Sequence, residues 1–437
     1  MDKRLEVVLR LPPSERMVGV VNAAIEKAAG AMGLDPQGAL AMTLAAEELF
    51  GYACRGSGAG MSEIACKDGG YRVVLEMELP AGALELRAIN LTYRPSPGTD
   101  DQMEEMGLVL ASRLADHLEL TTSPSGSLRM RLSKHKLYPP LDQLPRLPED
   151  TPPQNLSLLQ PNAEQLKLLA ALTCATYPPP VCMAQMCHPG KVVDMVASGD
   201  YAALVATNER GEVVGGVVWK MGGQKLVEFF GPYVFVPSAK QELSMTLVEG
   251  LISSVVRKGA VGLVCRFSPP DLPPGQFEPL GSMRLVGPDG RGSEHTAWFR
   301  LLEEDTPVTV WAHEGIREFL EENYERLVLA RRIQLASTQG ESMAAHSVVS
   351  TELVREQLVA VLRPLVPGQD MQQLLGEHCR VLTREGFANI FCEVDLGVAQ
   401  QVLFVPALLN TGFSPRMILP FAGNKDVVLM QWEGAGI

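Results

Sequence analysis

A proline-rich segment at residues 136–155 restricts the fold of this chain more than any other feature. It reads KLYPPLDQLPRLPEDTPPQN and holds six prolines among charged and polar residues. Proline fixes φ and lacks the backbone N–H, so such a run can continue neither a helix nor a central strand. We therefore expect an extended linker at 139–155, which follows an N-terminal domain at 1–138.

A second boundary is expected near residue 305, where the sequence LEEDTPVTVW ends a strand-like run in acidic residues. The chain after the linker then divides into two parts, at 156–304 and 305–437. A length of 437 residues is enough for several domains, each with a sizeable core.

The composition is that of a folded protein, with 46% hydrophobic and 20% charged residues. A formal charge of −13 without clustered Lys and Arg argues against a nucleic-acid partner. No apolar run is long enough to span a bilayer, and no apolar signal segment follows the start, so we expect no membrane contact. The eight cysteines lack disulfide-framework spacing, which favours a reducing compartment and a cytoplasmic location.

One group of possible metal ligands needs separate attention. Cys182, Cys187 and His188 place three soft ligands within seven residues. No second ligand pair follows at the spacing that zinc sites use. The sequence therefore predicts packing residues in a loop and no metal site.

The N-terminal part shows a regular order of helical and strand patterns. We expect a strand, two helices, a hairpin, a third helix and a last hairpin, at residues 4–11, 14–33, 35–56, 71–91, 104–116 and 117–133. Apolar residues recur at helical spacing in the helices and alternate with polar residues in the hairpins. Helices combined with an antiparallel sheet indicate an α+β sandwich.

Two glutamates, Glu47 and Glu48, interrupt the otherwise apolar second helix. Glu48 lies four residues after Leu44 and four before Tyr52, so these three share one helical face. A carboxylate on a mostly apolar face is either a solvated edge residue or part of a site.

Three stretches of the N-terminal domain resemble the histidine-kinase-like (GHKL) ATPase superfamily, above all the bacterial anti-sigma-factor serine kinases. They are LAAEELFGYACRG at 44–56, LELRAINLTYRPSPG at 84–98, and the helix with its hairpin at 106–134. The resemblance implies a two-layer α+β sandwich. It also implies a Glu that acts on the attacking group and an Asn four residues later that holds Mg²⁺. Glu48 matches the first of these positions.

The other nucleotide positions depart from that family. Tyr52 replaces the Asn, and a neutral phenol is a poor ligand for Mg²⁺. Asn90 stands where an adenine-reading Asp is expected, and the glycine-rich lid is reduced to Gly107. We therefore expect weak binding of ATP and Mg²⁺, or none. The alternative is a live kinase in which the metal is held by Glu47 with Asp100 or Asp101.

Residues 156–304 resemble the GNAT-type N-acetyltransferase superfamily. The likeness rests on a hairpin at 201–221, the strand YVFVP at 233–237, and the loop, helix and strand that follow. In that family this strand splays from its neighbour, and backbone N–H groups of the next loop hold the pyrophosphate of acetyl-CoA. The resemblance implies that acetyl-CoA, or another acyl-CoA, would contact Val234, Val236, Lys240 and Gln241.

The acyl-CoA loop is incomplete. The stretch SAKQELSMTL at 238–247 lacks both glycines of the R-x-x-G-x-G pattern, and Glu242 adds a charge that repels a pyrophosphate. For acyl transfer, Glu228 is the candidate base and Tyr233 the candidate acid. The alternatives are an exposed strand residue for Glu228 and a core aromatic for Tyr233. Residues 305–437 resemble the C-terminal half of the same fold, so we expect one or two GNAT-like mixed α/β lobes.

Two functional hypotheses follow. In the first, the chain is a bacterial regulatory protein that joins a degenerate anti-sigma-kinase-like domain to an acyltransferase-like module. It would bind a small molecule or acyl-CoA, and a protein partner, which the resemblance implies is a sigma factor or a STAS-type antagonist. In the second, it is an active acyl-CoA-dependent N-acetyltransferase regulated by its ATPase-like domain. If the chain is an enzyme, acyl transfer is favoured over serine phosphorylation.

Overall fold

The computed structural model describes residues 4–55, 60–79, 89–93, 114–122, 128–223, 225–273, 275–287, 289–304, 306–337 and 343–434. Asp100, Asp101 and Gly107 lie outside these ranges. The chain divides into two compact units. The N-terminal unit comprises residues 1–138 and 348–352, and the C-terminal unit comprises 139–347 and 353–437.

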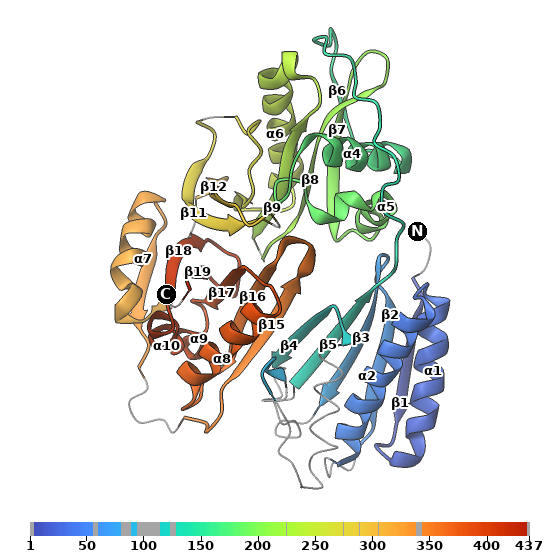
Figure 1. Ribbon diagram of the computed structural model, residues 1–437, viewed down its shortest axis with the longest axis vertical. Helices are drawn as coiled ribbons and strands as arrows, with labels where there is room; N and C mark the ends of the chain where they lie inside the picture. The colour runs from blue at the N-terminus through green and yellow to red at the C-terminus, as the bar shows by residue number, and fades with distance from the viewer. Residues whose placement is uncertain are drawn as a thin grey trace. The chain divides into compact units, whose positions relative to one another are not determined.

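The N-terminal unit is an antiparallel sheet with two helices packed on it (Figure 1). Its strands lie in the order β1-β2-β3-β5-β4. The elements are β1 (Glu6–Leu11), α1 (Val18–Ala31), α2 (Pro36–Arg55), β2 (Ser62–Asp68), β3 (Arg72–Leu79), β4 (His117–Thr122) and β5 (Leu128–His135). The helix α2 packs on β2, β3 and β5 and buries Ala46, Leu49 and Phe50. This is the layered α+β arrangement that the sequence predicts.

One strand of this sheet was not expected from the sequence. The strand β2 forms a hairpin with β3, in which Cys66 lies opposite Leu75. Ile64, Ala65 and Cys66 are all buried, so β2 lacks the alternation by which half-buried strands are recognised.

The C-terminal unit begins with a seven-stranded sheet in the order β11-β12-β10-β9-β8-β7-β6. The strands are β6 (Ser157–Leu159), β7 (Tyr201–Thr207), β8 (Val213–Met221), β9 (Leu226–Val234), β10 (Gly262–Cys265), β11 (Glu278–Val286) and β12 (Gly292–Leu301). Three helices, α4 (Ala163–Thr176), α5 (Pro189–Ala197) and α6 (Lys240–Val256), pack on it. The side chain of Asn162 caps α4 by accepting the Gln165 N–H, in a reciprocal capping box.

Two adjacent glycines of β8 place helices on both faces of this sheet. A Cβ on Gly215 would lie 3.1 Å from the Leu247 side chain of α6, and one on Gly216 would lie 2.5 Å from Leu169 of α4. Successive strand residues point to opposite faces, so α4 and α6 cover opposite sides. The glycines allow both helices to approach the sheet closely.

The centre of the sheet opens between β9 and β10. These neighbours are parallel, and their paired residues run from Leu226–Gly262 to Glu228–Val264. Beyond this point β9 continues to Val234, whereas β10 ends at Cys265. The second half of β9 therefore has backbone groups on this side that are not satisfied by β10.

The rest of the C-terminal unit repeats this strand order. Its strands β16 (Val359–Val366) and β17 (Asn389–Asp395) are parallel, and β19 (Val427–Trp432) pairs antiparallel with β17 and with β18 (Phe413–Leu419). The order β16-β17-β19-β18, with α8 (Met371–Arg384) as the crossover, matches β9-β10-β12-β11 with α6. Two short helices, α9 (Ala399–Val402) and α10 (Val405–Asn410), precede β18.

The second sheet has five strands, because β15 (Val348–Val354) is its edge strand next to β16, and the remaining elements flank it. A parallel two-stranded sheet is formed by β13 (Val308–Ala312) and β14 (Arg331–Leu335), with α7 (Glu314–Arg326) between them. The strand β15 begins in the N-terminal unit and ends in the C-terminal unit. Short 3₁₀ turns occur at Glu15–Met17, Ala184–Cys187, Pro237–Ala239 and Arg355–Gln357.

The two large sheets of the C-terminal unit meet along β11. Here the side-chain amide of Gln431 accepts a hydrogen bond from the Arg284 N–H and donates one to the Arg284 C=O. The side-chain amide of Asn389 forms the same two hydrogen bonds with the backbone of Val286. The contact is close because β11 carries a glycine, Gly281, whose added Cβ would lie 2.2 Å from the Arg416 carbonyl oxygen.

Gly281→Ala is therefore expected to lower the free energy of unfolding by about 2 kcal/mol, because backbone must move to admit the methyl group. Urea denaturation measures the change. Gly259→Ala is the matched control, since Gly259 also has positive φ but a Cβ there meets nothing within 4 Å. Equal losses in both variants would assign the effect to φ alone and contradict a close contact at β11.

Candidate functional site

The residues predicted to hold an acyl-CoA lie together at the end of β9. Val234 is the last residue of β9, Val236 precedes the 3₁₀ turn Pro237–Ala239, and Lys240 and Gln241 begin α6. Both valine side chains are buried. The sequence thus produces the expected strand, turn and helix N-terminus beside the opening between β9 and β10.

A tyrosine from elsewhere in the chain occupies this opening. Tyr177 is the C-terminal cap of α4. Its hydroxyl is within hydrogen-bond distance of both the N–H and the C=O of Val234. The oxygen accepts the Val234 N–H at 2.7 Å and lies 3.0 Å from the Val234 carbonyl oxygen. The free backbone groups at the end of β9 are therefore satisfied by Tyr177.

The same hydroxyl contacts a buried carboxylate, Asp271. A phenol has one proton, so it donates either to Asp271 or to the Val234 carbonyl. Burial and the neighbouring carboxylate raise the pKa of Tyr177. The phenol therefore stays neutral and continues to donate at physiological pH.

The predicted cation of the site is also paired. The Lys240 ammonium lies 2.8 Å from Asp271 Oδ1. Asp271 belongs to the loop between β10 and β11, so one carboxylate links Tyr177, this loop and the start of α6. The positive charge expected to attract a pyrophosphate is neutralised within the chain.

The linker supplies a further carboxylate to the loop before α6. Asp150 Oδ1 accepts the Ser238 N–H at 2.8 Å, and hydrogen bonds from Ser238 lower the pKa of Asp150. The linker is held at other points as well, since the Leu141 N–H donates to the Cys187 carbonyl. The Asp150 carboxylate, from the linker, thus accepts a backbone N–H that the predicted loop would otherwise donate to a pyrophosphate.

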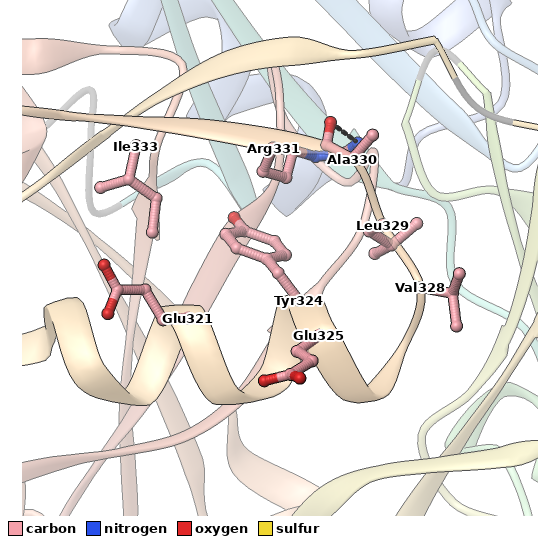
Figure 2. A pocket seen from close by; sticks show the side chains of 8 residues that line it. All are labelled: Glu321, Tyr324, Glu325, Val328, Leu329, Ala330, Arg331 and Ile333. Atoms are coloured by element: carbon pink, nitrogen blue, oxygen red, sulfur yellow. Dashed lines mark hydrogen bonds between the residues drawn. The ribbon is translucent and has the colours of Figure 1, made fainter.

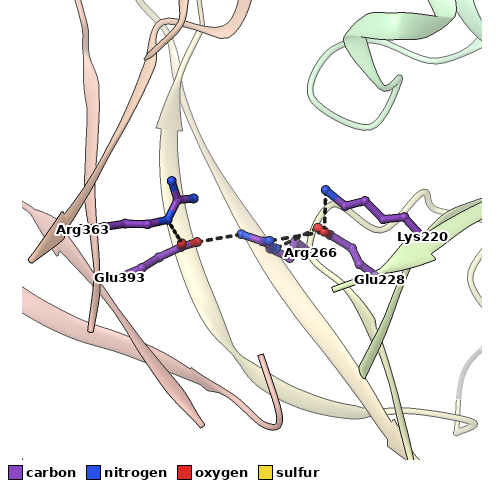
Figure 3. A network of polar contacts seen from close by, with 5 residues as sticks. All are labelled: Lys220, Glu228, Arg266, Arg363 and Glu393. Carbon is purple, nitrogen blue, oxygen red and sulfur yellow. Dashed lines mark hydrogen bonds and ion pairs between the residues drawn. The ribbon is translucent and has the colours of Figure 1, made fainter. Parts of the chain in front are cut away.

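Glu228, the candidate base, lies inside a network of charges (Figure 3). It is 4% exposed, so it is not the exposed strand residue that was the alternative. Its carboxylate oxygens lie 2.8 Å from Arg266 Nε and 3.3 Å from Lys220 Nζ. Burial alone would raise the pKa of Glu228, but the two cations lower it to about 2. A buried, doubly paired carboxylate with so low a pKa is a poor general base.

The network continues into the second sheet. Arg266 Nη1 lies 3.2 Å from Glu393 of β17, and Glu393 accepts a hydrogen bond from Arg363 of β16 at 2.8 Å. Figure 3 shows the five side chains as one chain of alternating charge. Glu228 therefore contributes to joining the two sheets of the C-terminal unit.

Tyr233, the candidate acid, is fully buried. Its hydroxyl donates to the Val181 carbonyl at 3.0 Å, and its ring packs against Tyr177 with centroids 5.1 Å apart. Burial raises the pKa of Tyr233 well above its usual range. These contacts fit the alternative interpretation, a core aromatic residue.

The predicted nucleotide residues of the N-terminal unit have structural partners. Glu47 accepts a hydrogen bond from the Asn22 side chain of α1 at 2.9 Å, while Glu48 is half-buried on α2. Tyr52 is buried within the unit. Asn90 is also buried and accepts the Val349 N–H at 2.8 Å. The side chain expected to face adenine thus bonds a later segment of the same unit.

A separate cavity of about 460 Å³ lies where α7 meets β14 (Figure 2). Its lining residues are Glu321, Tyr324, Glu325, Val328, Leu329, Ala330, Arg331 and Ile333. Arg331 is buried and paired with Asp426, so its charge is already neutralised. None of the residues predicted as a site lines this cavity.

Sequence reasoning missed Tyr177, Asp271 and Asp150. One signal was present in each case: the tyrosine ends a capped helix before three prolines, and both aspartates lie in proline-rich loops. Each can reach the site only because the fold brings distant segments together.

Among the helices that the structure describes, none combines the length and the hydropathy that a membrane-spanning helix needs.

Comparison with known proteins gives matches to solved structures alone. No family model matches the sequence, and no curated protein sequence does. A GNAT-superfamily phosphinothricin acetyltransferase from Sinorhizobium meliloti, in complex with acetyl-CoA, is 18% identical with a TM-score of 0.30. That match covers 35% of this chain and 90% of the other. An N-acetyltransferase from Staphylococcus aureus Mu50 is 16% identical with a TM-score of 0.30. That match covers 34% of this chain and 100% of the other.

An aminoglycoside 6'-acetyltransferase type Ii is also 16% identical, with a TM-score of 0.28, and covers 34% of this chain and 99% of its own. About a third of the chain is thus similar to solved structures of acetyltransferases, one of them described as a GNAT-superfamily protein. The comparisons give no support to the resemblance of the N-terminal domain to GHKL ATPases.

Proposed function

We propose that this chain is a regulatory binding protein whose GNAT-like module, residues 156–304, does not transfer acyl groups while Tyr177 occupies the opening between β9 and β10. The observation that carries the proposal is the pair of contacts from the Tyr177 hydroxyl to the N–H and C=O of Val234. A ligand that lies along the edge of β9 needs the backbone groups that Tyr177 occupies.

The chemistry of the neighbouring side chains argues against acyl transfer. Acyl transfer needs a base that can take a proton from the acceptor and an acid that can protonate the thiolate. Glu228 is buried and its carboxylate is paired with two cations. Tyr233 is buried too, and its hydroxyl donates its proton in a hydrogen bond to a backbone carbonyl. An acyl-CoA could enter only by displacing Tyr177, and its pyrophosphate would compete with Asp150 for the Ser238 N–H.

For the rest of the chain the proposal follows the resemblances. Residues 305–437 form a second, partial GNAT-like lobe, which the repeated strand order supports. The N-terminal domain, 1–138, is an anti-sigma-kinase-like module with weak ATP binding or none, and it binds a protein partner such as a sigma factor or a STAS-type antagonist. The burial of Tyr52 and the bond between Asn90 and Val349 support the loss of nucleotide binding.

The test is thermal-shift measurement of the full chain with acetyl-CoA, together with an assay for released CoA. The wild type is expected to show neither stabilisation nor turnover. Tyr177→Ala, which clears the edge of β9, is expected to gain a shift that depends on acetyl-CoA. A ligand at 100 times its Kd stabilises by about 2.7 kcal/mol, which is readily measured.

Tyr201→Ala is the matched control, because Tyr201 is a partly buried aromatic on β7 of the same sheet. It should behave as the wild type does. Release of CoA by the wild-type protein in the presence of an amine acceptor would contradict the proposal. That result would favour the alternative, an active N-acetyltransferase.

A further inference from the structure

Three cysteine thiols lie close together near Tyr177, in and after the end of α4. Cys174 lies near the end of α4, Cys182 in the following loop, and Cys187 at the end of the turn Ala184–Cys187. The Cys174 sulfur lies 3.0 Å from that of Cys187 and 3.5 Å from that of Cys182. Cys187 is exposed, Cys174 is half-buried and Cys182 is buried, so one thiol of the closest pair is open to solvent.

The distances favour a dithiol over a metal site. Two thiolates on a tetrahedral zinc, each with a bond of about 2.3 Å, lie roughly 3.7 Å apart. The Cys174–Cys187 separation is shorter than this and is about 1 Å longer than the ~2.05 Å bond of a disulfide. Among the residues that the structure describes, no group of three or more His, Cys, Asp or Glu side chains could hold a metal ion.

We propose that Cys174 and Cys187 are a reversible dithiol–disulfide pair that is oxidised by hydroperoxides. The Cys187 thiolate attacks the O–O bond, forms a sulfenic acid and releases an alcohol, or water from hydrogen peroxide. The Cys174 sulfur then attacks the Cys187 sulfur, the S–S bond forms, and the hydroxyl leaves as water. Two thiols lose two electrons and two protons, and one O–O bond is reduced.

The surroundings of Cys187 set the rate of the first step. Although the residue is exposed as a whole, partial desolvation of its thiol and the hydrogen bond with Cys174 raise the pKa of Cys187 to about 11. Because the thiolate is the nucleophile, only a very small fraction of the Cys187 thiol is reactive at pH 7. Oxidation is therefore slow at neutral pH and should proceed on the order of 100-fold faster at pH 9.

A Cys174–Cys187 bond would fix the segment that contacts the end of β9. Residues 175–186 lie between the two cysteines. They include Tyr177, whose hydroxyl is hydrogen-bonded to Val234, and Val181, whose carbonyl accepts the Tyr233 hydroxyl. The Cys187 carbonyl also accepts the linker N–H of Leu141. A Cys174–Cys187 disulfide therefore closes a short loop around Tyr177 and ties it to the point where the linker attaches. This goes beyond the proposed function and does not depend on it.

The experiment treats the full-length protein with hydrogen peroxide at pH 7 and pH 9, followed by non-reducing peptide mapping. No Lys or Arg lies between the two cysteines, so trypsin releases both on one peptide, residues 168–191. The expected product is this peptide with an internal Cys174–Cys187 bond, lighter by two hydrogens and restored by dithiothreitol. Closing a loop of this length should raise the Tm by up to about 5 °C. Cys187→Ser should abolish both the loss of two hydrogens from this peptide and the Tm increase.

Two further variants separate this pair from the other cysteines. Cys182→Ser should still form the Cys174–Cys187 bond, and Cys54→Ser, in the N-terminal unit, should behave as the wild type does. The proposal is overturned if Cys187 is recovered as a free thiol or only as sulfinic or sulfonic acid. It is also overturned if the product joins two chains, or if purified protein carries zinc that Cys187→Ser loses.

Discussion

Replacing Asp426 by asparagine is expected to lower the free energy of unfolding by about 4 kcal/mol. The side chains of Asp426 and Arg331 are 1% and 0% exposed, and their atoms lie 2.6 Å and 3.2 Å apart in a two-point contact. Asp426 also accepts the Phe421 N–H at 2.9 Å. The asparagine keeps the size of the side chain but leaves the Arg331 cation buried without a counter-charge.

The buried environment makes this loss large. The guanidinium lies over the rings of Phe421 and Tyr324, at 5.2 Å and 5.8 Å from their centroids, and these rings do not replace a carboxylate. Removing one partner of a buried pair costs about 3–5 kcal/mol, whereas an exposed pair contributes about 0–1 kcal/mol.

Urea denaturation of Asp426→Asn measures the change in free energy. Glu321→Gln is the matched control, because Glu321 pairs with Arg317 at 2.8 Å on the exposed face of α7. Its expected loss is below about 0.5 kcal/mol. The double variant Arg331→Met with Asp426→Leu should recover much of the stability, since no unpaired charge remains. A loss below about 1 kcal/mol for Asp426→Asn would show that water or another group reaches Arg331.

Arg266→Met is expected to cost about 3 kcal/mol, because it removes the central cation from the network of Figure 3. Glu228 keeps Lys220 and Glu393 keeps Arg363, so each carboxylate loses one partner and retains one. The loss should affect the joining of the two sheets of the C-terminal unit, where Arg266 bridges β9 and β17.

The pH dependence of this loss has a defined direction. The pKa of Glu228 is lowered to about 2 from the ordinary 4.5, so its ionised form stabilises the fold above pH 4.5. That contribution disappears as the pH falls from 4.5 towards 2. The difference in stability between wild type and Arg266→Met should therefore shrink over this interval.

Urea titrations at pH 6, 4.5 and 3 follow this difference. Arg210→Gln is the control, because Arg210 forms an exposed pair with Glu149 at 3.5 Å. Its effect should stay small at each pH. A constant difference between wild type and Arg266→Met at all three values would mean that Glu228 is not the group that Arg266 stabilises.

Local pattern was enough to place most of the framework. The strand, turn and helix that contain Val234, Val236 and Lys240 follow from alternation, a proline and helical spacing, and the structure has them in that order. The proline-rich segment contains no helix or strand, as proline chemistry requires. The division of the chain at 304 and 305 stays a prediction.

Whether the predicted site residues are free or paired depends on residues far away in the sequence, which no local pattern identifies. Glu228 and Arg266 are 38 residues apart in sequence, and Arg266 and Glu393 are 127 apart. Tyr177 and Asp271 are separated by 94 residues, and Asp150 and Ser238 by 88. A strand glutamate that will be buried on two cations has the same local sequence pattern as one that could act as a base.

The return of residues 348–352 to the N-terminal unit affects the order in which the chain can fold during its synthesis. The Asn90 amide oxygen cannot accept the Val349 N–H until about two hundred residues beyond the linker have been made. At roughly 5–20 residues per second, that delay is on the order of 10–40 s. The first unit to leave the ribosome is therefore completed only after most of the second has emerged.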